Sequence, residues 1–540
     1  MIRSSAINPQ SPFADIKDSM KAITVLFAGN LKSEALIPLE NIGKSAFCLA
    51  LEQAKQFPDT EKLVVLGYDN AKYPDCGVEF SLISSEKWTR KSMLEAISKL
   101  EFGYDIVYFA WLDCPFLDPA LAAALKQRHT QYAADYSYAD GFPYGFAPEL
   151  LSPGVSGILF NIDNEEDVPV TRDALFQVIQ KDINAFNIET EIAPVDLRLL
   201  RLCLAADSKR NLLLLNRWLK STAQAFEDKK IPVASDAASL VEKHPQMLRT
   251  LPSFYNIQVC EACPQDCSYC PWPKIKAERK SPGNGCMDPD KFKQILDKII
   301  EFSGDAVISL SFWGELALHP QKIELISMVL ERPSLSLIIE TSGIGWKQEE
   351  LKTISSMVQN AAKRTGVFLD ASLSWIVSLD AFDPARYKEV RGPGFSEANT
   401  CVNQLIELFS GNIYLQAIRF QGAEDDIEAF YRHWKNLLGQ TNHVIIQKYD
   451  HFSGRLPRLQ ASDLSPVRRQ PCWHIKRDMH IALDGTVLRC RTDFGSNELN
   501  VFNNSFTEIW DSTNSLYLEH CKGQYAGECA DCDEYYTYNF

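Results

Sequence analysis

The strongest constraint on the fold is a repeated alternation of short apolar runs and amphipathic segments between residues 251 and 460. Six runs have the length and composition of buried strands: Phe254–Val259, Val307–Phe312, Leu335–Glu340, Trp375–Leu379, Ile413–Phe420 and Val444–Lys448. Amphipathic stretches such as Asp290–Phe302 and Ile323–Leu330 separate them. Six strand–helix units predict an incomplete (β/α)6 barrel of the TIM type, with its functional residues at the carboxyl ends of the strands.

The first 205 residues show the same alternation on a smaller scale. Three apolar runs are typical of buried strands: Ile23–Ala28, Leu63–Gly67 and Ile106–Ala110. The helical stretch Lys44–Gln56 lies between the first two runs and Pro119–His129 follows the third, which predicts a parallel α/β domain. Residues 206–250 are polar, have a helical pattern and carry no motif, so we expect a helical linker there. The remaining segment, 461–540, is short, cysteine-containing and aromatic-rich.

Composition narrows the class of protein. The chain has 540 residues, so several domains are expected, and its net charge of −15 disfavours non-specific binding to nucleic acid. No run of eighteen apolar residues predicts a membrane span, and no secretory signal is evident at the N-terminus. We therefore expect a cytoplasmic protein. In that reducing setting the fifteen cysteines are expected to be metal ligands or buried thiols rather than disulfides.

Three cysteines follow the first barrel strand with the spacing CxxxCxxC: Cys263, Cys267 and Cys270. Three thiolates can each hold one iron of an iron–sulfur cube, which leaves the fourth iron open for another ligand. Zinc is the alternative, because Cys260 would complete a set of four thiols.

This motif in this position resembles the radical SAM superfamily, in which S-adenosylmethionine (SAM) chelates the open iron. The resemblance implies a 5′-deoxyadenosyl radical that takes hydrogen from a substrate, and a reductant such as flavodoxin or ferredoxin. Gly314 and Glu315, in Trp-Gly-Glu-Leu, stand where the family usually has Gly-Gly-Glu-Pro and contacts the SAM amino group. Arg391 resembles the arginine that pairs with the SAM carboxylate, a role suited to a guanidinium fork.

The same resemblance implies contacts to the rest of SAM. Ser378 and Asp380, at the end of the fourth strand, match the position that contacts the ribose, and Tyr269 matches the aromatic residue beside the adenine. No catalytic acid or base can be identified. Four residues could face the pocket but are more typical of structural or solvent-facing positions: Asp370, Tyr449, His451 and His474.

A second cysteine group lies near the C-terminus. It comprises Cys472, Cys490, Cys529 and Cys532, with four residues between Gly485 and Cys490. The pattern resembles the SPASM domain and its one-cluster relative, Twitch, and residues 480–490 read as a hairpin with an Asp-Gly turn. A full SPASM domain continues with further cysteines, so the resemblance implies one auxiliary [4Fe–4S] cluster on these four. Structural zinc is the alternative, and Cys521 could replace one ligand.

The N-terminal domain resembles GT-A-type nucleotidyltransferases, which have a Rossmann-like fold. The resemblance rests on Trp-Leu-Asp-Cys-Pro-Phe at 111–116, and it implies that Asp113 binds Mg²⁺. The phosphate-binding Gly-x-Gly-x-Arg loop is absent, because Asn-Leu-Lys-Ser-Glu stands at 30–34. This favours a degenerate domain that binds a substrate or partner.

The three regions in this order resemble the spiro-SPASM family. The leading hypothesis is a radical SAM enzyme that modifies a peptide or protein. A small-molecule dehydrogenase and a non-catalytic iron–sulfur or zinc protein are the alternatives.

Overall fold

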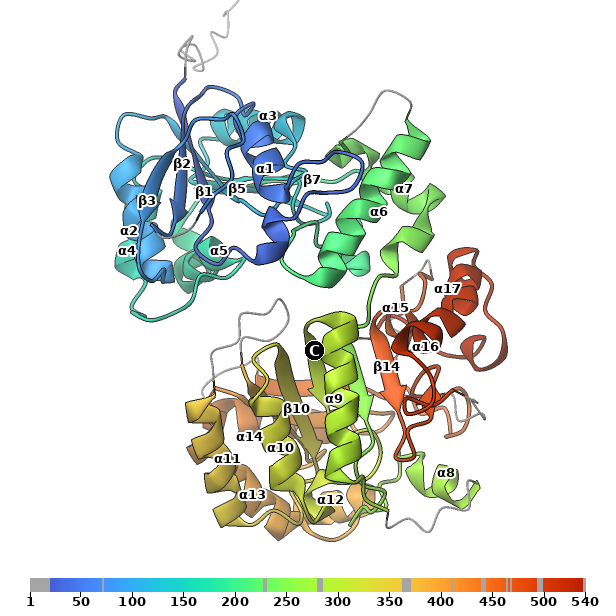
Figure 1. Cartoon of the computed structure of the whole chain (residues 1–540). Coiled ribbons are helices and arrows are strands. Elements are labelled where there is room, and N and C mark those ends of the chain that lie inside the picture. Colours follow the sequence, from blue (N-terminus) through green and yellow to red (C-terminus); the bar gives the residue numbers. More distant parts are fainter. Residues whose placement is uncertain are drawn as a thin grey trace, which may run out of the picture. The chain divides into compact units, whose positions relative to one another are not determined.

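The structure is a computed structural model. It describes the following residues: 20–69, 72–226, 231–278, 285–361, 371–409, 411–438, 443–462, 465–466, 469–492 and 499–537. The chain forms two compact units (Figure 1). The first contains the residues up to Asp207 together with Leu215–Leu240, and the second contains Ser208–Leu214 and the residues from Val241 onward.

The first unit is built on a seven-stranded sheet with the order β3-β2-β1-β4-β6-β5-β7 (Figure 1). Its strands are β1 (Ala22–Phe27), β2 (Thr60–Gly67), β3 (Ser81–Ser84), β4 (Ile106–Trp111), β5 (Tyr136–Asp140), β6 (Glu149–Leu151) and β7 (Ile188–Ile192). β6 runs antiparallel to both of its neighbours, and the other pairs are parallel. The predicted α/β fold of this region is confirmed.

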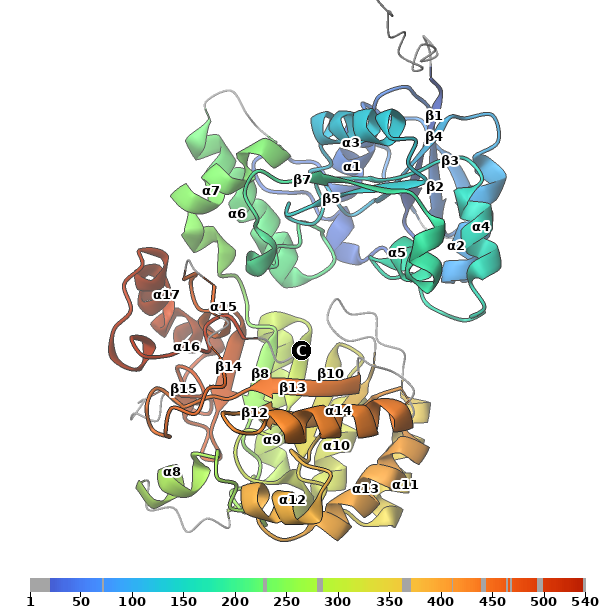
Figure 2. The ribbon, with the colours of Figure 1, turned by 180° about the vertical axis from the view of Figure 1, so that it is seen from behind.

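The first unit contains the helices α1 (Ala46–Ala54), α2 (Arg90–Leu100), α3 (Pro119–Gln131), α4 (Val155–Ile162) and α5 (Ala174–Ile179). It also contains most of α6 (Lys209–Ala225) and α7 (Ala237–Lys243), whereas α6 up to Leu214 and α7 from Val241 belong to the second unit. α2 and α4 lie side by side (Figure 2). α3 begins where Asp118 accepts a hydrogen bond from Ala120 N, with Pro119 in the first turn. In the segment predicted as a linker, buried Trp218 of α6 packs its ring against buried Phe146.

Cys48 and Cys76 form a disulfide in the first unit, with their Cα atoms 5.2 Å apart. The expectation that the cysteines are ligands or buried thiols was therefore wrong for this pair. The bond joins α1 to the segment before β3, two positions that the fold brings within disulfide reach although 28 residues separate them.

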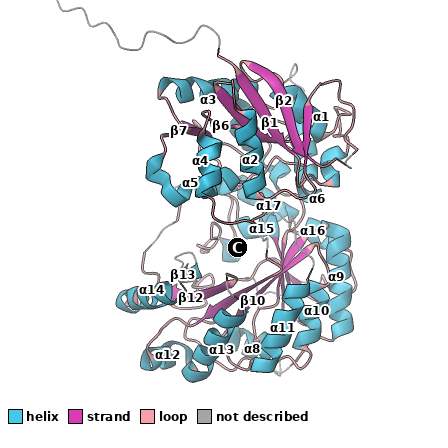
Figure 3. Ribbon diagram, turned by 90° about the vertical axis from the view of Figure 1, so that its left-hand side faces the viewer, coloured by secondary structure: helices cyan, strands magenta, loops and turns pink. Residues whose placement is uncertain are grey.

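The second unit contains the six predicted barrel strands in sequence order, all parallel: β8 (Phe254–Ile257), β9 (Ala306–Ser309), β10 (Leu335–Thr341), β11 (Leu373–Ser378), β12 (Ile413–Arg419) and β13 (Val444–Lys448). Its helices are α8 (Trp272–Glu278), α9 (Pro289–Ser303), α10 (Lys322–Leu330), α11 (Gln348–Asn360), α12 (Pro384–Arg391), α13 (Phe395–Leu408) and α14 (Glu424–Leu438). Helices α9, α10 and α11 flank the strands on their outer side (Figure 3).

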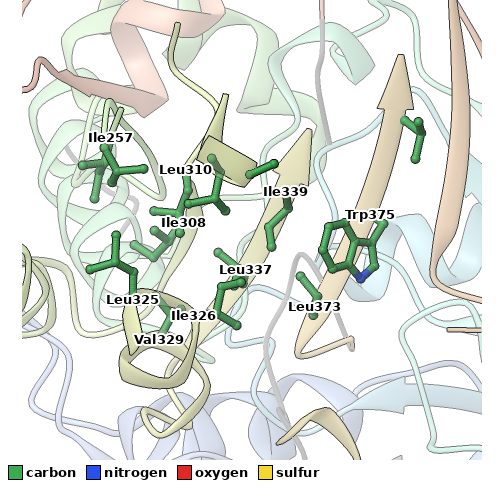
Figure 4. Close-up of a cluster of buried hydrophobic side chains, with 14 of the residues drawn as sticks. Ile257, Ile308, Leu310, Leu325, Ile326, Val329, Leu337, Ile339, Leu373 and Trp375 are labelled. Atoms are coloured by element: carbon green, nitrogen blue, oxygen red, sulfur yellow. The ribbon is translucent and has the colours of Figure 1, made fainter. Parts of the chain in front are cut away.

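Buried aliphatic side chains join strands and helices in this unit. Leu325 and Ile326 of α10 point toward Ile308 of β9 and Leu337 of β10, and all four are fully or almost fully buried (Figure 4). The apolar side of α10 explains why this segment forms a helix against the sheet. Removal of this apolar surface from water is the main force that holds α10 against the sheet.

The C-terminal segment extends the barrel sheet instead of forming a separate layer. β14 (Asp478–Ile481) pairs in parallel with β8, and β15 (Val487–Leu488) pairs antiparallel with β14. The predicted hairpin is confirmed, with Gly485 at φ +87° in its turn. Three helices complete this part: α15 (Trp473–Arg477), α16 (Phe506–Ser512) and α17 (Asn514–Cys521). Within the described residues, no helix is both long and apolar enough to cross a membrane.

Candidate functional site

The three thiols of the CxxxCxxC motif lie in the loop that follows the carboxyl end of β8. Burial raises the pKa of Cys270 to about 12, and the neighbouring Cys267 and Cys263 contribute to the rise. Burial also raises the pKa of Cys263 to about 11, with Cys267 again a contributor. The three sulfurs are therefore close enough to interact electrostatically, as ligands of one cluster must be.

The spacing of ligand atoms in the described residues can be compared with that expected around a single zinc ion. Two thiolates on one zinc ion lie at most about 4.6 Å apart, because each Zn–S bond is about 2.3 Å. We consider trios of His, Cys, Asp and Glu side chains whose ligand atoms all lie within 4.8 Å of one another. Among the described residues, the only such trio is Asp450, Asp533 and Glu534. No cysteine trio therefore has single-ion spacing in the described chain. A four-iron cube spreads its thiolates over separate irons, and the choice between a cluster and zinc at the motif cysteines remains a prediction.

Cys260 does not join the motif cysteines. Its side chain is buried, and its Sγ lies 3.6 Å from Sγ of Cys286. The two residues face each other across an isolated antiparallel bridge. The motif therefore retains three thiols in this structure.

Gly314 and Glu315 brace the loop from the end of β9. Gly314 has φ +87°, and a Cβ atom there would lie 1.9 Å from Cys260 O, so only glycine fits. Glu315 N donates to Ala262 O at 2.8 Å. The buried Glu315 carboxylate accepts hydrogen bonds from Thr341 Oγ1 (2.7 Å) and from Ser342 N and Oγ (2.8 and 2.7 Å). The turn thus ties the cluster loop to the end of β10, and its contact to SAM remains a prediction.

Three of the residues expected to contact SAM form one buried network. Arg391 Nη1 lies 2.6 Å from Asp380 Oδ2, and Tyr269 donates its hydroxyl hydrogen to the same oxygen at 2.5 Å. Arg391 Nε and Nη2 donate to Gln265 Oε1 at 3.0 and 2.8 Å. Asp380 Oδ1 accepts from Ile418 N at 2.8 Å. The structure therefore directs Arg391 toward protein acceptors, and its contact to a SAM carboxylate remains a prediction.

Ser378 belongs to a second network at the strand ends. Its Oγ donates to Glu340 Oε1 at 3.1 Å, and Gln416 Nε2 donates to the same oxygen at 2.8 Å. These residues come from β10, β11 and β12, so three adjacent strands fix one carboxylate. Sequence reasoning missed Glu340, although a signal was present: it ends a predicted barrel strand, where functional side chains gather.

A cavity of about 200 Å³ lies at these strand ends. Its wall includes Tyr269, Cys270, Trp313, Glu340, Tyr449 and Arg491. Of the residues considered for the pocket, Tyr449 lines it, His451 lies 3.6 Å from Asp533, and His474 is bonded to Asp478 at 2.6 Å. Asp370 lies outside the described residues.

The four C-terminal cysteines expected to hold the auxiliary cluster lie together. Burial raises the pKa of Cys472, and Cys532 and Cys490 add to the rise. Burial raises the pKa of Cys529 to about 11, with Cys490 as the next contributor. The pKa of Cys521 is raised by burial and lowered by Tyr517 and Lys476, and no cluster cysteine contributes to it. Cys521 packs against the small apolar cluster that contains Cys472, so the ligand set of Cys472, Cys490, Cys529 and Cys532 remains a prediction.

Charged side chains connect this C-terminal group to the cavity. Arg491 follows Cys490, and its Nη2 donates to Asp450 Oδ2 at 2.8 Å and to Glu534 Oε2 at 2.9 Å. Lys448, at the end of β13, donates to Glu534 at 2.5 Å. Lys448, Asp450 and Arg491 all line the cavity, so the segment that carries Cys490 forms part of its wall. The segment that carries Cys532 is joined to that wall through the bonds of Glu534. No local feature of the sequence predicts these pairings.

In the first unit, Asp113 is bound by an arginine. Arg172 donates to both carboxylate oxygens of Asp113 at 2.8 and 2.6 Å, and to Asp207 Oδ2 at 3.0 Å. The guanidinium also lies over the Trp111 ring, 4.4 Å from its centre. Both oxygens expected to bind Mg²⁺ thus already have a cationic partner, and metal binding by Asp113 remains a prediction.

Comparison with known proteins assigns the chain to a family. It is 35% identical over 375 residues to an uncharacterized protein of Treponema pallidum (strain Nichols), covering 68% of this chain and 98% of that protein. The chain belongs to the same family as the Treponema protein. In this chain, residues 472–533 match the SPASM iron–sulfur cluster-binding domain, which confirms the predicted domain type. All four C-terminal cysteines lie inside the matched range.

Solved structures resemble parts of this family member at low sequence identity. SuiB of Streptococcus suis bound to the precursor peptide SuiA has a TM-score of 0.40 and 12% identity, and the match covers 77% of this chain and 84% of SuiB. A cytidylyltransferase from Leptospira borgpetersenii serovar Hardjo-bovis (strain JB197) has a TM-score of 0.35 and 16% identity, covering 42% of this chain and 97% of that chain.

Proposed function

We propose that this protein is a radical SAM enzyme that binds a [4Fe–4S] cluster through Cys263, Cys267 and Cys270, together with SAM. The observation that supports the proposal is that Cys260, the nearby fourth thiol, does not join the three motif cysteines. The motif cysteines share one loop at the carboxyl end of β8, whereas Cys260 lies against Cys286. A cube with three protein thiolates keeps one iron for a ligand that the protein does not supply.

When bound, the cluster and SAM supply a 5′-deoxyadenosyl radical that removes hydrogen from the substrate. The chain's own residues position the loop for this chemistry. Tyr269, between two of the cysteines, is bonded to Asp380 beyond the end of β11, and Glu315 holds the loop from the ends of β9 and β10. These bonds join the loop to the ends of β9, β10 and β11 and so hold its position relative to the barrel strands.

For the substrate, we propose a peptide or protein whose side chain enters the cavity. The cavity lies beside the motif cysteine Cys270, so a side chain that enters it would lie next to the cluster loop. Arg491 lines this cavity beside Cys490, so a bound side chain would lie near the auxiliary cluster. That cluster would orient the substrate or accept an electron, and a flavodoxin or ferredoxin would supply the reducing electron.

Dehydrogenation of a small molecule is the second candidate function. The small cavity and its fixed charges, Glu340 and Arg491, also suit a compact polar substrate. Release of 5′-deoxyadenosine stimulated by short peptides would favour the first candidate, and stimulation by small polyols or aminated sugars would favour the second.

The decisive experiment is reductive cleavage of SAM. The full chain, reconstituted anaerobically with iron and sulfide, is given SAM and dithionite, and 5′-deoxyadenosine is quantified. We expect release by the parent protein and by Cys401→Ser, which removes a buried helical thiol outside both motifs. We expect none from Cys267→Ala. Equal release by Cys267→Ala, or none from a cluster-loaded parent, would overturn the proposal.

A further inference from the structure

Cys260 and Cys286 occupy a cross-strand geometry that allows a disulfide. Glu261 N donates to Gly285 O and Met287 N donates to Val259 O, each at 2.9 Å, on either side of the pair. These bonds make Cys260 and Cys286 a non-hydrogen-bonded antiparallel pair, the position at which side chains approach most closely. Their sulfurs are already 3.6 Å apart, so a bond of about 2.05 Å requires only a small movement.

The two cysteines enclose the cluster loop. The chain between them runs from Glu261 to Gly285 and contains all three motif cysteines. Cys260 also supports the adjoining turn, because its carbonyl oxygen occupies the space where a Gly314 side chain would be. A bond between Cys260 and Cys286 would therefore close the base of the loop without using a cluster ligand.

We infer that Cys260 and Cys286 form a reversible thiol–disulfide site at the base of the cluster loop, separate from both sets of cluster ligands. This inference goes beyond the proposed function, since the pair can react whether or not SAM is cleaved. In either redox state, Cys286 keeps Cys260 away from the motif cysteines, so a fourth thiolate does not reach the open iron. In the oxidised state the bond also restricts the loop when no cluster is bound.

The oxidant is a low-molecular-weight disulfide such as glutathione disulfide. Cys286 is exposed and Cys260 is buried, so the Cys286 thiolate attacks first, forming a mixed disulfide and releasing one glutathione thiolate. Cys260 then loses its proton and attacks the Cys286 sulfur, which releases the second glutathione. Two protein thiols are oxidised, the two electrons reduce one glutathione disulfide, and the two protons end on the released glutathione.

The test is differential alkylation of the full, cluster-loaded chain. The protein is treated with glutathione disulfide, its free thiols are blocked with iodoacetamide, and the peptides are analysed by mass spectrometry without reduction. We expect a linked Cys260–Cys286 peptide, with loss of two alkylation adducts relative to untreated protein. The bond should disappear after dithiothreitol, with both adducts restored.

Variants identify the order of attack. Cys401→Ser should retain the linked peptide, Cys286→Ser should lose it, and Cys260→Ser should carry glutathione on Cys286. Two results with the parent protein alone would overturn the inference: Cys260 and Cys286 both fully alkylated after oxidation, or Cys260 linked to Cys263, Cys267 or Cys270. Absorbance of the cluster and release of 5′-deoxyadenosine are recorded on the same samples, so failure of the proposed function is seen separately.

Discussion

Arg391 and Asp380 form a buried ion pair beneath the cluster loop, with Nη1 of the arginine 2.6 Å from Oδ2 of the aspartate. The arginine lies in the last turn of α12, and the aspartate follows β11 with φ +63°, a strained conformation for a residue other than glycine. Tyr269 is bonded to the same aspartate oxygen. The pair therefore fixes an aromatic residue that lies between two of the motif cysteines.

Loss of Arg391 should destabilise the barrel. Arg391→Gln leaves the buried Asp380 without a compensating charge, so we expect a loss of about 3–5 kcal/mol in the free energy of unfolding. Urea denaturation of the cluster-free chain, followed by tryptophan fluorescence, measures the loss. Arg386→Gln on the same helix is the control, because its partner Glu389 is exposed and its partner Asp426 is half-buried rather than fully buried. Equal losses in the two variants would contradict this account of the pair.

Gly314 should not tolerate a side chain. Gly314→Ala combines a left-handed backbone with a Cβ that would lie 1.9 Å from Cys260 O, so the turn and the loop must separate. We expect a loss of at least about 2 kcal/mol in stability, with reduced iron uptake at the motif cysteines. Gly411→Ala is the matched control, because Gly411 also has positive φ but meets nothing within 4 Å. If Gly314→Ala takes up iron as the parent does, the close packing of this turn is not required.

The C-terminal cysteines differ in their expected effect on iron content. Two four-iron cubes give about eight iron atoms per chain. Cys532→Ser removes an expected ligand and should lower the content by about four, whereas Cys521→Ser should leave it unchanged. Iron and acid-labile sulfide are measured after anaerobic reconstitution. The reverse result would place Cys521 in the ligand set instead of Cys532.

The first unit should lose stability in acid through Asp163. Burial alone would raise the pKa of this carboxyl, but hydrogen bonds from Arg90 and Lys181 lower it to about 2. A depressed carboxyl pKa contributes stability that is fully present above its unfolded value of about 3.9 and is lost as pH falls toward 2. Asp163→Asn should therefore lose stability at pH 7 and show a shallower decline between pH 5 and 2.5, measured by denaturant unfolding. The control is Asp167→Asn, because Asp167 forms an exposed ion pair with Lys87. This variant should retain the parent's dependence of stability on pH. An unchanged acid profile for Asp163→Asn would exclude this carboxyl as a source of the decline.

The sequence predicted the features that depend on local pattern. Each barrel strand is a short apolar run, and its periodicity does not depend on distant residues, so all six were found. Cysteine spacing likewise identified the SPASM segment. What the sequence could not give are pairings between distant segments. Arg172 binds Asp113 across 59 residues, and Arg491 binds Asp450 across 41.

Glu340 illustrates the boundary between these two groups. Its place at the end of a strand could be read from the sequence, but its hydrogen bonds to Ser378 and Gln416 depend on the order of strands in the sheet. The pairing of β14 with β8 was missed for the same reason, because 220 residues and more separate the paired positions, as in Phe254 with Asp478.

The central claim is that the cluster on Cys263, Cys267 and Cys270 has one iron open to SAM. The most direct measurement uses a Cys472→Ala/Cys490→Ala variant, which leaves only the motif cluster, reduced with dithionite and examined by electron paramagnetic resonance. The account predicts that adding SAM shifts the g-values of the reduced motif cluster. In the control variant Cys267→Ala/Cys270→Ala, which lacks the motif cluster, adding SAM should cause no shift. A spectrum of the motif cluster that does not change when SAM is added in excess would contradict it.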